Sequence, residues 1–379
     1  MIKRTLENKI KKRLFKGKVI LLLGPRQVGK TTLAESLMQA YKDDLIWLSG
    51  DEPNDRERIQ NSGIAALRSL IGKKKILVVD EAQRISNAGL TFKIIADKMK
   101  HVQVLATGSS AFELSSMFNE PLTGRKYEYT LFPLSFTELS NHTNPFEETS
   151  QLENRLIYGS YPEVVNSPGE EKEKLSLLSD SYLYKDLFAY EKIKKPSLLS
   201  TLLKALALQM GSEVSYNELG QITGADKETV EKYIDLLEKA FIVFRLNAFN
   251  RNVRNELKKS RKIYFYDNGI RNAIIGNYAP LSVRQDKGAL WENYLISERW
   301  KKLHYAGYYG HRYFWRTTQQ QEIDYVEEID GKLSAYEIKW NAKTKTKFST
   351  TFLNAYNVAH TEIINKENYH QWLGENFET

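Results

Sequence analysis

A glycine-framed loop that directly follows an apolar run constrains this chain most. Residues 20–32 read Ile-Leu-Leu-Leu-Gly-Pro-Arg-Gln-Val-Gly-Lys-Thr-Thr, which places Gly24-x4-Gly29-Lys30-Thr31 after an expected buried strand over 19–23. Gly24 and Gly29 let the backbone turn tightly, so that successive amide groups can point inward and hold phosphate oxygens. The strand before the loop argues against a chance match, and we expect a Walker A loop in an α/β domain.

The residues of this loop divide the work of binding a nucleoside triphosphate and its metal ion. Lys30 can reach the β- and γ-phosphates, and the Thr31 hydroxyl can bind Mg2+. A helix that we expect to begin near Lys30 adds its positive dipole end to the anion site. The candidate ATP-binding residues of the loop are Gly24, Pro25, Arg26, Gln27, Val28, Gly29, Lys30, Thr31 and Thr32.

A second apolar run ends in two acids. Residues 76–81 read Ile-Leu-Val-Val-Asp-Glu, the pattern of a Walker B strand. Asp80 can hold Mg2+ through water, and Glu81 can polarise the water that attacks the γ-phosphate. A buried strand followed by a surface acidic pair would give the same pattern without function, but the loop upstream favours the Walker B interpretation.

Further short apolar runs over 45–48 and 102–106 predict two more strands. Strands that alternate with helices predict a parallel sheet with helices on both faces, and nucleotide then binds at the carboxyl ends of the strands. Thr107, Ser109 and Ser110 follow the run over 102–106, where their hydroxyls can touch the γ-phosphate or its water. A helix cap made by a hydroxyl residue is the alternative.

The composition bounds the class of protein. At 379 residues, with 41% hydrophobic and 27% charged residues, the chain is expected to fold into two or three globular domains. It contains no cysteine, which excludes disulfides and thiolate metal sites and fits a cytoplasmic protein. We expect no membrane span and no signal peptide. The net charge of +8 fits either a polyanionic partner or a surplus of lysine for solubility.

Several phrases together resemble one family. They are residues 24–32, Leu-Val-Val-Asp-Glu-Ala-Gln over 77–83 and Ala-Thr-Gly-Ser-Ser over 106–110, followed by phrases at 122–125, 132–136 and 158–163. The chain is similar, over nearly its whole length, to prokaryotic AAA-superfamily ATPases with a C-terminal domain of unknown function 4143. In AAA-type ATPases an arginine often acts in trans on a neighbour's nucleotide. The resemblance therefore implies a homo-oligomer in which Arg125 is the candidate for this arginine. The alternative is that Arg125 is an ordinary surface residue.

The middle of the chain is expected to be helical. Residues 141–150 are polar and suit a linker or exposed loop, and a helix, a glycine turn, a second helix and a strand over 215–246 resemble a winged helix. The acidic residues of the second helix favour a role in packing within the protein over DNA binding, because they repel phosphate. DNA binding stays open as the alternative. A basic stretch fits a phosphate-binding wing or a solvated hairpin tip. The groove-facing candidates are Lys227, Thr229 and Lys232, and the stretch holds Arg251, Arg254, Lys258, Lys259, Arg261 and Lys262.

The C-terminal third carries a second chemical constellation. Two strands around the Asp330-Gly331 turn predict a hairpin that bears Asp324, Glu337 and Lys339. Two carboxylates on adjacent strands can coordinate Mg2+, and a lysine beside them can stabilise a pentavalent phosphate. With Glu292 on a preceding helix as a third metal ligand, the set resembles a restriction-endonuclease-type core. A buried ion network in an inactive domain is the alternative.

The sequence thus predicts an α/β chain with a P-loop AAA-type ATPase domain over 1–140. A helical, winged-helix-like region over 141–280 and a restriction-endonuclease-like domain over 281–379 are expected to follow. The leading hypothesis is an ATPase that uses ATP and Mg2+ and is coupled to a nuclease-like, DNA-binding module. A nuclease gated by ATP and an ATP-dependent switch that binds a protein partner are the alternatives.

Overall fold

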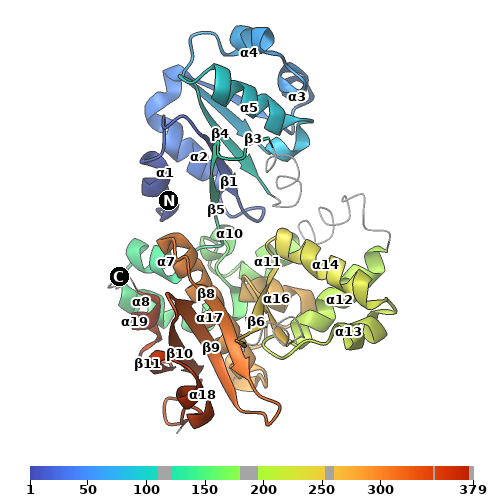
Figure 1. Cartoon of the computed structure of the whole chain (residues 1–379), viewed down its shortest axis with the longest axis vertical. Coiled ribbons are helices and arrows are strands. Elements are labelled where there is room, and N and C mark those ends of the chain that lie inside the picture. Colours follow the sequence, from blue (N-terminus) through green and yellow to red (C-terminus); the bar gives the residue numbers. More distant parts are fainter. Residues whose placement is uncertain (110–120, 180–194, 252–259, 345, 375–379) are drawn as a thin grey trace. The chain divides into compact units, whose positions relative to one another are not determined.

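The computed structural model describes residues 1–109, 121–179, 195–251, 260–344 and 346–374 (Figure 1). The chain divides into two compact units. Unit 1 comprises Met1–Leu134 with Lys239–Phe241, and unit 2 comprises Ser135–Glu238 and Ile242–Thr379. Among the described residues, no helix combines the length and the apolar character needed to cross a bilayer. The three-domain boundaries expected from the sequence stay a prediction.

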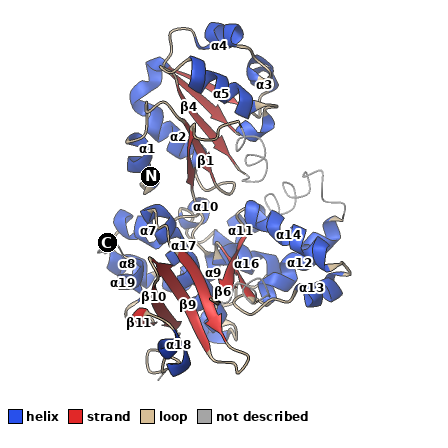
Figure 2. Ribbon diagram, viewed as in Figure 1, coloured by secondary structure: helices blue, strands red, loops and turns tan. Residues whose placement is uncertain are grey.

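Unit 1 is built around a five-stranded sheet in the order β2-β3-β4-β1-β5, in which every pair is parallel. Helices flank both faces of this sheet, as Figures 1 and 2 show. Its elements are α1 (Leu6–Lys11), β1 (Val19–Leu23), α2 (Lys30–Met38), η1 (Gln39–Asp44), β2 (Leu45–Ser49), α3 (Pro53–Ile59), α4 (Ile64–Ile71), β3 (Ile76–Asp80), η2 (Ala82–Arg84), α5 (Ala88–Lys98), β4 (Gln103–Gly108) and β5 (Lys126–Thr130).

The sheet of unit 1 follows the apolar runs of the sequence. All residues of β1 and β4 are buried, and β3 is buried until its last residue. The edge strands β2 and β5 are only partly buried. Continuous apolar runs suit parallel strands that are covered on both faces. The expected strands and the α/β fold class are confirmed.

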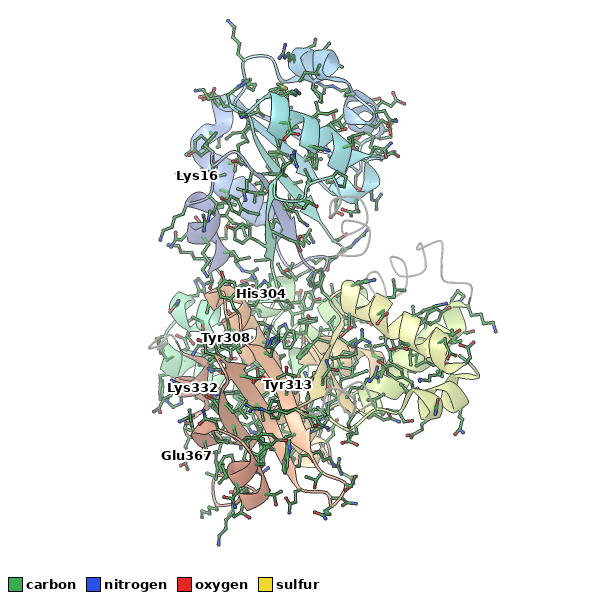
Figure 3. The ribbon with its side chains drawn as sticks, viewed as in Figure 1. Lys16, His304, Tyr308, Tyr313, Lys332 and Glu367 are labelled. Carbon is green, nitrogen blue, oxygen red and sulfur yellow. The ribbon has the colours of Figure 1, made fainter. Side chains whose placement is uncertain are left out.

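Unit 2 contains a mixed six-stranded sheet in the order β11-β10-β9-β8-β6-β7. Figure 3 shows the side chains, with Tyr313 labelled on β8 and Lys332 on β10. The elements are α7 (Phe136–His142), α8 (Pro145–Ser150), α9 (Leu152–Tyr158), α10 (Pro162–Val165), α11 (Glu171–Ser179), α12 (Pro196–Leu208), α13 (Tyr216–Thr223), α14 (Lys227–Lys239), β6 (Val243–Ala248), β7 (Arg261–Phe265), α16 (Asn268–Ile275), η4 (Leu281–Val283), α17 (Lys287–Ala306), β8 (His311–Arg316), β9 (Glu322–Ile329), β10 (Lys332–Ile338), α18 (Thr350–Ala355), β11 (Val358–Ile364) and α19 (Tyr369–Leu373).

One expectation about unit 2 is wrong. Residues 141–150 are not a loop, because α7 runs to His142 and α8 begins at Pro145. The side chain of Asn144 accepts a hydrogen bond from the backbone N–H of Glu147 at 2.9 Å. An asparagine N-cap followed by proline at the first helical position is a helix start signal, although the same residue types also favour turns.

The expected hairpin and its neighbouring helix are present. β9 and β10 are antiparallel with Tyr325 opposite Tyr336, and the chain reverses at Asp330 and Gly331, both with positive φ. The helix expected to carry Glu292 is α17, which starts at Lys287 and runs for 20 residues. Phe249, Trp315, Ile323 and Phe352 belong to one apolar core cluster of this sheet.

Candidate functional site

The phosphate loop is shaped by backbone that only small residues tolerate. Gly24 has φ +149°, and a Cβ there would lie 2.1 Å from the carbonyl oxygen of Leu131. Gly29, at the start of α2, has φ +90°, and Gln27 also has a positive φ. These turns curl the loop over the amino end of α2, where backbone N–H groups and the helix dipole favour an anion.

Lys30 is buried and folded back on the loop. Its Nζ donates to the carbonyl oxygens of Gly24 at 3.0 Å and Pro25 at 2.7 Å. Phosphate oxygens are stronger acceptors than neutral carbonyls, because both partners of the hydrogen bond are then charged. Lys30 is therefore already placed at the loop and needs only to exchange acceptors when a triphosphate binds.

A residue outside the motif holds the loop from behind. Arg4 donates from Nη1 to the carbonyl oxygen of Val28 and from Nη2 to that of Phe132, both at 2.6 Å. Val28 is fully buried, whereas Gln27, Thr31 and Thr32 are exposed. Sequence reasoning missed Arg4, because nothing near residue 4 shows that its partner lies 128 positions away.

Asp80 and Thr31 come together as a magnesium site requires. The Thr31 hydroxyl donates to Asp80 Oδ2 at 3.0 Å, and the Thr107 hydroxyl donates to Asp80 Oδ1. β4 lies between β1 and β3, which puts Thr107 beside both motifs. A hydroxyl and a carboxylate oxygen are the ligands that Mg2+ prefers, so Thr31 and Asp80 fit this ion.

Glu81 is fixed by neighbours on β4, directly after β4 and on η2. Its backbone is left-handed with φ +48°, its N–H donates to Thr107 Oγ1 at 3.1 Å, and its Oε2 accepts from Ser109 Oγ at 3.1 Å. Oε2 also accepts from Gln83 Nε2, which donates to Ser109 Oγ at 3.0 Å. Ser109 thus contacts the expected catalytic acid. Ser110, the last residue of that phrase, lies outside the described residues.

Backbone packing explains why Glu81 holds this conformation. Gly50 follows β2, and its N–H donates to the carbonyl oxygen of Asp80 at 2.7 Å. A Cβ at Gly50 would lie 2.2 Å from the carbonyl oxygen of Glu81. Sequence reasoning missed Gly50 and Gln83, and it expected the Thr107 hydroxyl at the γ-phosphate, whereas this hydroxyl donates to Asp80. Gln83 stands within a phrase that carries the family resemblance, which is the one signal that pointed to it.

Arg125 lies away from this site within its own chain. Its carbonyl oxygen accepts from the backbone N–H of Val19, the first residue of β1, whereas the phosphate loop follows the last. The five residues of β1 span about 15 Å, so Arg125 and the phosphate loop lie at opposite edges of the sheet. Arg125 Nε donates to Asp97 Oδ1 at 2.7 Å, and this hydrogen bond lowers the pKa of Asp97. A role of Arg125 in trans stays a prediction.

The second group of expected residues meets on the hairpin of unit 2. Asp324 of β9 and Glu337 of β10 each directly neighbour a residue of the Tyr325–Tyr336 pair, and Lys339 Nζ lies 2.9 Å from Asp324 Oδ2 and 2.7 Å from Glu337 Oε2. The backbone N–H of Ile338 also donates to Asp324 at 2.8 Å. Burial and then the charge of Asp324 raise the pKa of Glu337 to about 7, although Lys339 opposes the shift.

Glu292 joins this group through residues that the sequence placed elsewhere. Its Oε1 accepts from Tyr264 OH at 2.6 Å and from Lys262 Nζ at 3.2 Å, and Lys262 also pairs with Glu322 at 2.6 Å. Burial raises the pKa of Glu292, and the nearby charge of Asp324 adds to the shift. We call Glu292, Glu322, Asp324, Glu337, Lys262, Lys339 and Tyr264 the acid cluster.

The acid cluster does not form a ready metal site. Across the described ranges, no group of three or more histidines or acids has the spacing to hold a metal ion. Each carboxylate instead faces a lysine or tyrosine. Asp324 and Glu337 together fit a cation, since Lys339 already bridges them, but Glu292 points to Tyr264 and Lys262. The assignment of Glu292, Asp324 and Glu337 as metal ligands stays a prediction.

The basic stretch is not a loop throughout. Arg261 and Lys262 open strand β7, and the Lys262 side chain is only 4% exposed. The expectation of a solvated wing or tip is therefore wrong for Lys262, whose partners are acids of α17 and β9. Arg254, Lys258 and Lys259 lie outside the described residues. Asp226 caps α14, accepting from the Thr229 backbone N–H at 2.7 Å.

The parallel sheet, the loop after β1 and the acidic pair after β3 define a P-loop nucleoside triphosphatase domain of AAA type. Residues 16–140 match the family described as an AAA domain, residues 149–281 a domain of unknown function (DUF8612), and residues 287–378 a domain of unknown function (DUF4143). The chain therefore combines an AAA domain with a domain of unknown function 4143, and the resemblance is confirmed.

Other proteins are similar to different lengths of this chain. An uncharacterized protein of Mycobacterium tuberculosis is 26% identical over 341 residues, which cover 87% of this chain and 72% of that protein. The replication factor C large subunit of Methanococcus maripaludis is 41% identical over 73 residues, or 19% of this chain and 15% of that protein. The Pif1 helicase from Candida albicans is a structural match with a TM-score of 0.28 and 15% sequence identity. The match covers 47% of this chain and 48% of that chain.

Proposed function

We propose that this chain is a Mg2+-dependent ATPase whose nucleotide cycle acts through unit 2. The observation that carries the proposal is the network around Glu81, in which its carboxylate accepts hydrogen bonds from Gln83 and Ser109 while Asp80 accepts from Thr31. A carboxylate held beside a metal-binding pair at the ends of parallel strands is what in-line attack of water on a γ-phosphate needs. A location in the cytoplasm remains a prediction.

The side chains of unit 1 each have a role in this proposal. Lys30 leaves the carbonyl oxygens of Gly24 and Pro25 and donates to the β- and γ-phosphates. Thr31 and Asp80 would hold Mg2+, which neutralises the charge that develops on the phosphate oxygens. Glu81 accepts a proton from the attacking water, and Ser109 and Gln83 keep its carboxylate oriented.

Steady-state release of inorganic phosphate from ATP tests this assignment. Glu81→Gln is expected to lower kcat by about 100- to 10,000-fold, the range of general-base catalysis, while a fluorescent ATP analogue still binds. Lys30→Ala is expected to abolish both turnover and binding. Glu57→Gln, on α3, is the matched control for the charge change. Turnover that survived in Glu81→Gln would remove Glu81 from the mechanism.

A second candidate function, cleavage of a phosphodiester, is favoured by the hairpin of unit 2. Asp324 and Glu337 stand on adjacent strands, and Lys339 contacts both. Two carboxylates would hold a divalent cation, and an adjacent ammonium would stabilise the charge on the phosphate oxygens. The resemblance of this set to a restriction-endonuclease-type core supports the same proposal.

A metal- and ATP-dependence assay on single-stranded, duplex and branched nucleic acids tests the second function. We expect Mg2+-dependent nicking that Glu337→Gln abolishes while ATP turnover persists. Lack of cleavage of every substrate would favour the alternative, an ATP-dependent switch whose acid cluster is an ion network and whose unit 2 binds a protein partner. Either function is compatible with a homo-oligomer in which Arg125 acts on a neighbour's nucleotide.

A further inference from the structure

A cavity of about 410 Å3 in unit 2 belongs to neither site described above. It lies where α9, the segment before α17, the end of β10 and the segment after β11 meet. Its lining includes Glu153, Leu281, Ser282, Lys287, Trp340 and Lys366. We call this space the Lys287–Lys366 cavity.

Two lysines converge on this cavity without an acid between them. Lys366 Nζ lies 3.5 Å from the centre of the Trp340 ring, and Lys287 Nζ contacts the carbonyl oxygen of Ser282 at 3.5 Å. Neither lysine has an ion-pair partner in the part of the chain that the structure describes. Burial, together with the charge of Lys287, lowers the pKa of Lys366, so these cations destabilise each other.

One carboxylate lines the cavity and is partly committed elsewhere. Glu153 Oε1 accepts a hydrogen bond from the backbone N–H of Leu281 at 3.1 Å. Its charge favours the protonated form of Lys366 but is the smallest of the three influences on that lysine. The cavity thus keeps a net positive charge, and an anion between the lysines would relieve their repulsion.

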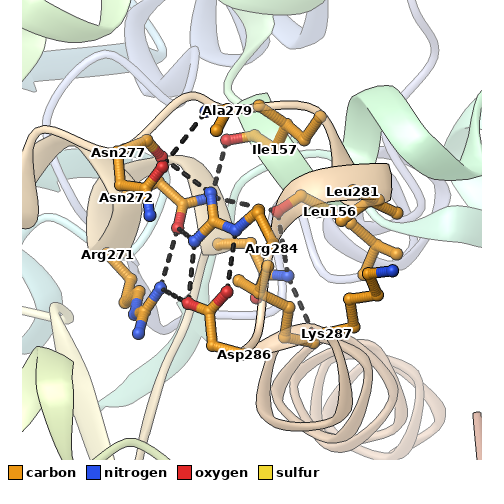
Figure 4. Close-up of polar contacts among 12 residues, drawn as sticks. Leu156, Ile157, Arg271, Asn272, Asn277, Ala279, Leu281, Arg284, Asp286 and Lys287 are labelled. Atoms are coloured by element: carbon orange, nitrogen blue, oxygen red, sulfur yellow. Dashed lines mark hydrogen bonds and ion pairs between the residues drawn. The ribbon is translucent and has the colours of Figure 1, made fainter.

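The start of α17 adds a second source of positive potential. Asp286 precedes this helix, but it makes no side-chain cap, and the first turn contains no acid. The Asp286 carboxylate instead accepts from Arg284 at 2.8 Å and from Arg271 at 2.6 Å, as Figure 4 shows beside Lys287. The positive end of a 20-residue helix therefore carries no neutralising side chain at the cavity.

The cavity is tied to the acid cluster by the chain itself. Trp340 lines the cavity and directly follows Lys339, whose side chain bridges Asp324 and Glu337. The carbonyl oxygen of Lys339 accepts from Trp291 Nε1 at 3.2 Å, and the rings of Trp291 and Trp340 pack edge to face at 5.6 Å. An anion held in the cavity would thus lie close to the hairpin.

From these contacts we infer that the Lys287–Lys366 cavity binds one backbone phosphate of a nucleic-acid strand and seats that strand beside the acid cluster. The choice of nucleic acid rests on the proposed function of unit 2, whereas the phosphate site rests on the lysines and the helix end. Two ammonium groups and backbone N–H groups recognise phosphate and not bases, so binding is independent of sequence.

Fluorescence anisotropy with a labelled single-stranded oligonucleotide tests the inference, in EDTA and in a Lys30→Ala background that removes the phosphate loop as a competing site. Lys366→Glu is compared with Lys332→Glu. Lys332 is the first residue of β10, whereas Lys366 follows β11, so the same charge change is made away from the cavity. Figure 3 labels Lys332 and Glu367, the residue after Lys366. Only Lys366→Glu is expected to raise Kd, by about tenfold, and to reduce the salt slope by about 1. Lys366→Arg keeps the charge and should bind like the parent.

Two results would overturn the inference. One is the same Kd in Lys366→Glu and Lys332→Glu. The other is a loss of binding of inorganic phosphate or a mononucleotide in Lys366→Glu with oligonucleotide binding unchanged, which would replace the strand by a small phosphate ligand. With Lys30 restored, Lys366→Glu is expected to hydrolyse ATP normally. A wild-type chain that binds the oligonucleotide but cleaves no nucleic acid would refute phosphodiester cleavage by unit 2 and leave the binding result standing.

Discussion

The phosphate loop of unit 1 and the acid cluster of unit 2 differ in the partners of their charged side chains. The first holds Lys30 against neutral carbonyl oxygens and Asp80 against hydroxyl groups, so it is prepared for a charged ligand. The second pairs its carboxylates with its own lysines, Lys262 and Lys339. Neighbouring acids therefore have hydroxyl and amide donors as partners in unit 1, whereas in unit 2 their partners are lysines of the same unit.

The largest effect on stability is expected from Lys262→Met, which removes the buried cation between Glu292 and Glu322. A buried pair that loses one partner costs about 3–5 kcal/mol, because the remaining charges stay desolvated. Urea unfolding measures the change. Lys174→Met is the matched control, since Lys174 also faces two glutamates but on the exposed side of α11. Equal stability of the two variants would show that the acid cluster is not a self-neutralised network.

A smaller effect, dependent on pH, is expected from Glu337→Gln. The pKa of Glu337 is raised from 4.5 to about 7, so the folded state binds its proton more tightly than the unfolded state does. The stability this gives is fully present below pH 4.5 and is lost as pH rises through about 7. At about 1.4 kcal/mol per pKa unit, the wild type loses up to about 3 kcal/mol over this range.

Urea unfolding of both chains between pH 4 and 8 checks this expectation. The glutamine variant should have a flat profile where the wild type declines, so the two curves separate only above about pH 5. Parallel profiles would mean that Glu337 titrates normally and is not the desolvated group that its surroundings in the acid cluster require.

Much of unit 1 could be predicted because each strand and each motif is a continuous stretch of the sequence. Buried strands of a parallel sheet are unbroken apolar runs, and the loop and Asp80 stand directly at strand ends. What could not be predicted depends on strand order: Thr107 reaches Asp80 only because β4 lies between β1 and β3. Arg4 was missed for the same reason, since its partner Phe132 is distant in sequence.

Unit 2 was harder to predict because its site is assembled from three separate segments. The expected hairpin is present and carries Asp324 and Glu337 on its two adjacent strands. Lys262, however, looked like part of a basic surface stretch, and only the pairing of β7 with β6 and its packing on α17 bury it. A local charge pattern cannot show whether a lysine faces solvent or an acid on a distant element.

In unit 1, a moderate loss of activity is expected from Gln83→Leu. The Glu81 carboxylate keeps its Ser109 donor but loses the one from Gln83, so its orientation is less well fixed. We expect kcat for ATP to fall by about tenfold, with KM unchanged, as for a residue that positions a catalytic group. Arg84→Leu, the next residue and an exposed partner of Asp51, is the control. A raised KM with unchanged kcat would assign Gln83 to nucleotide binding instead.

The smallest structural effect is expected from Arg125→Ala, since Arg125 and Asp97 are 40% and 36% exposed and exposed ion pairs contribute little. The melting temperature should be unchanged in Arg125→Ala and in Asp97→Ala, which breaks the same pair but keeps the arginine. The two differ if Arg125 acts in trans: ATP turnover then falls only in Arg125→Ala, and mixing this variant with Glu81→Gln restores part of it, because each supplies what the other lacks. Equal turnover in both variants would make Arg125 a surface residue and confine ATP hydrolysis to groups of one chain.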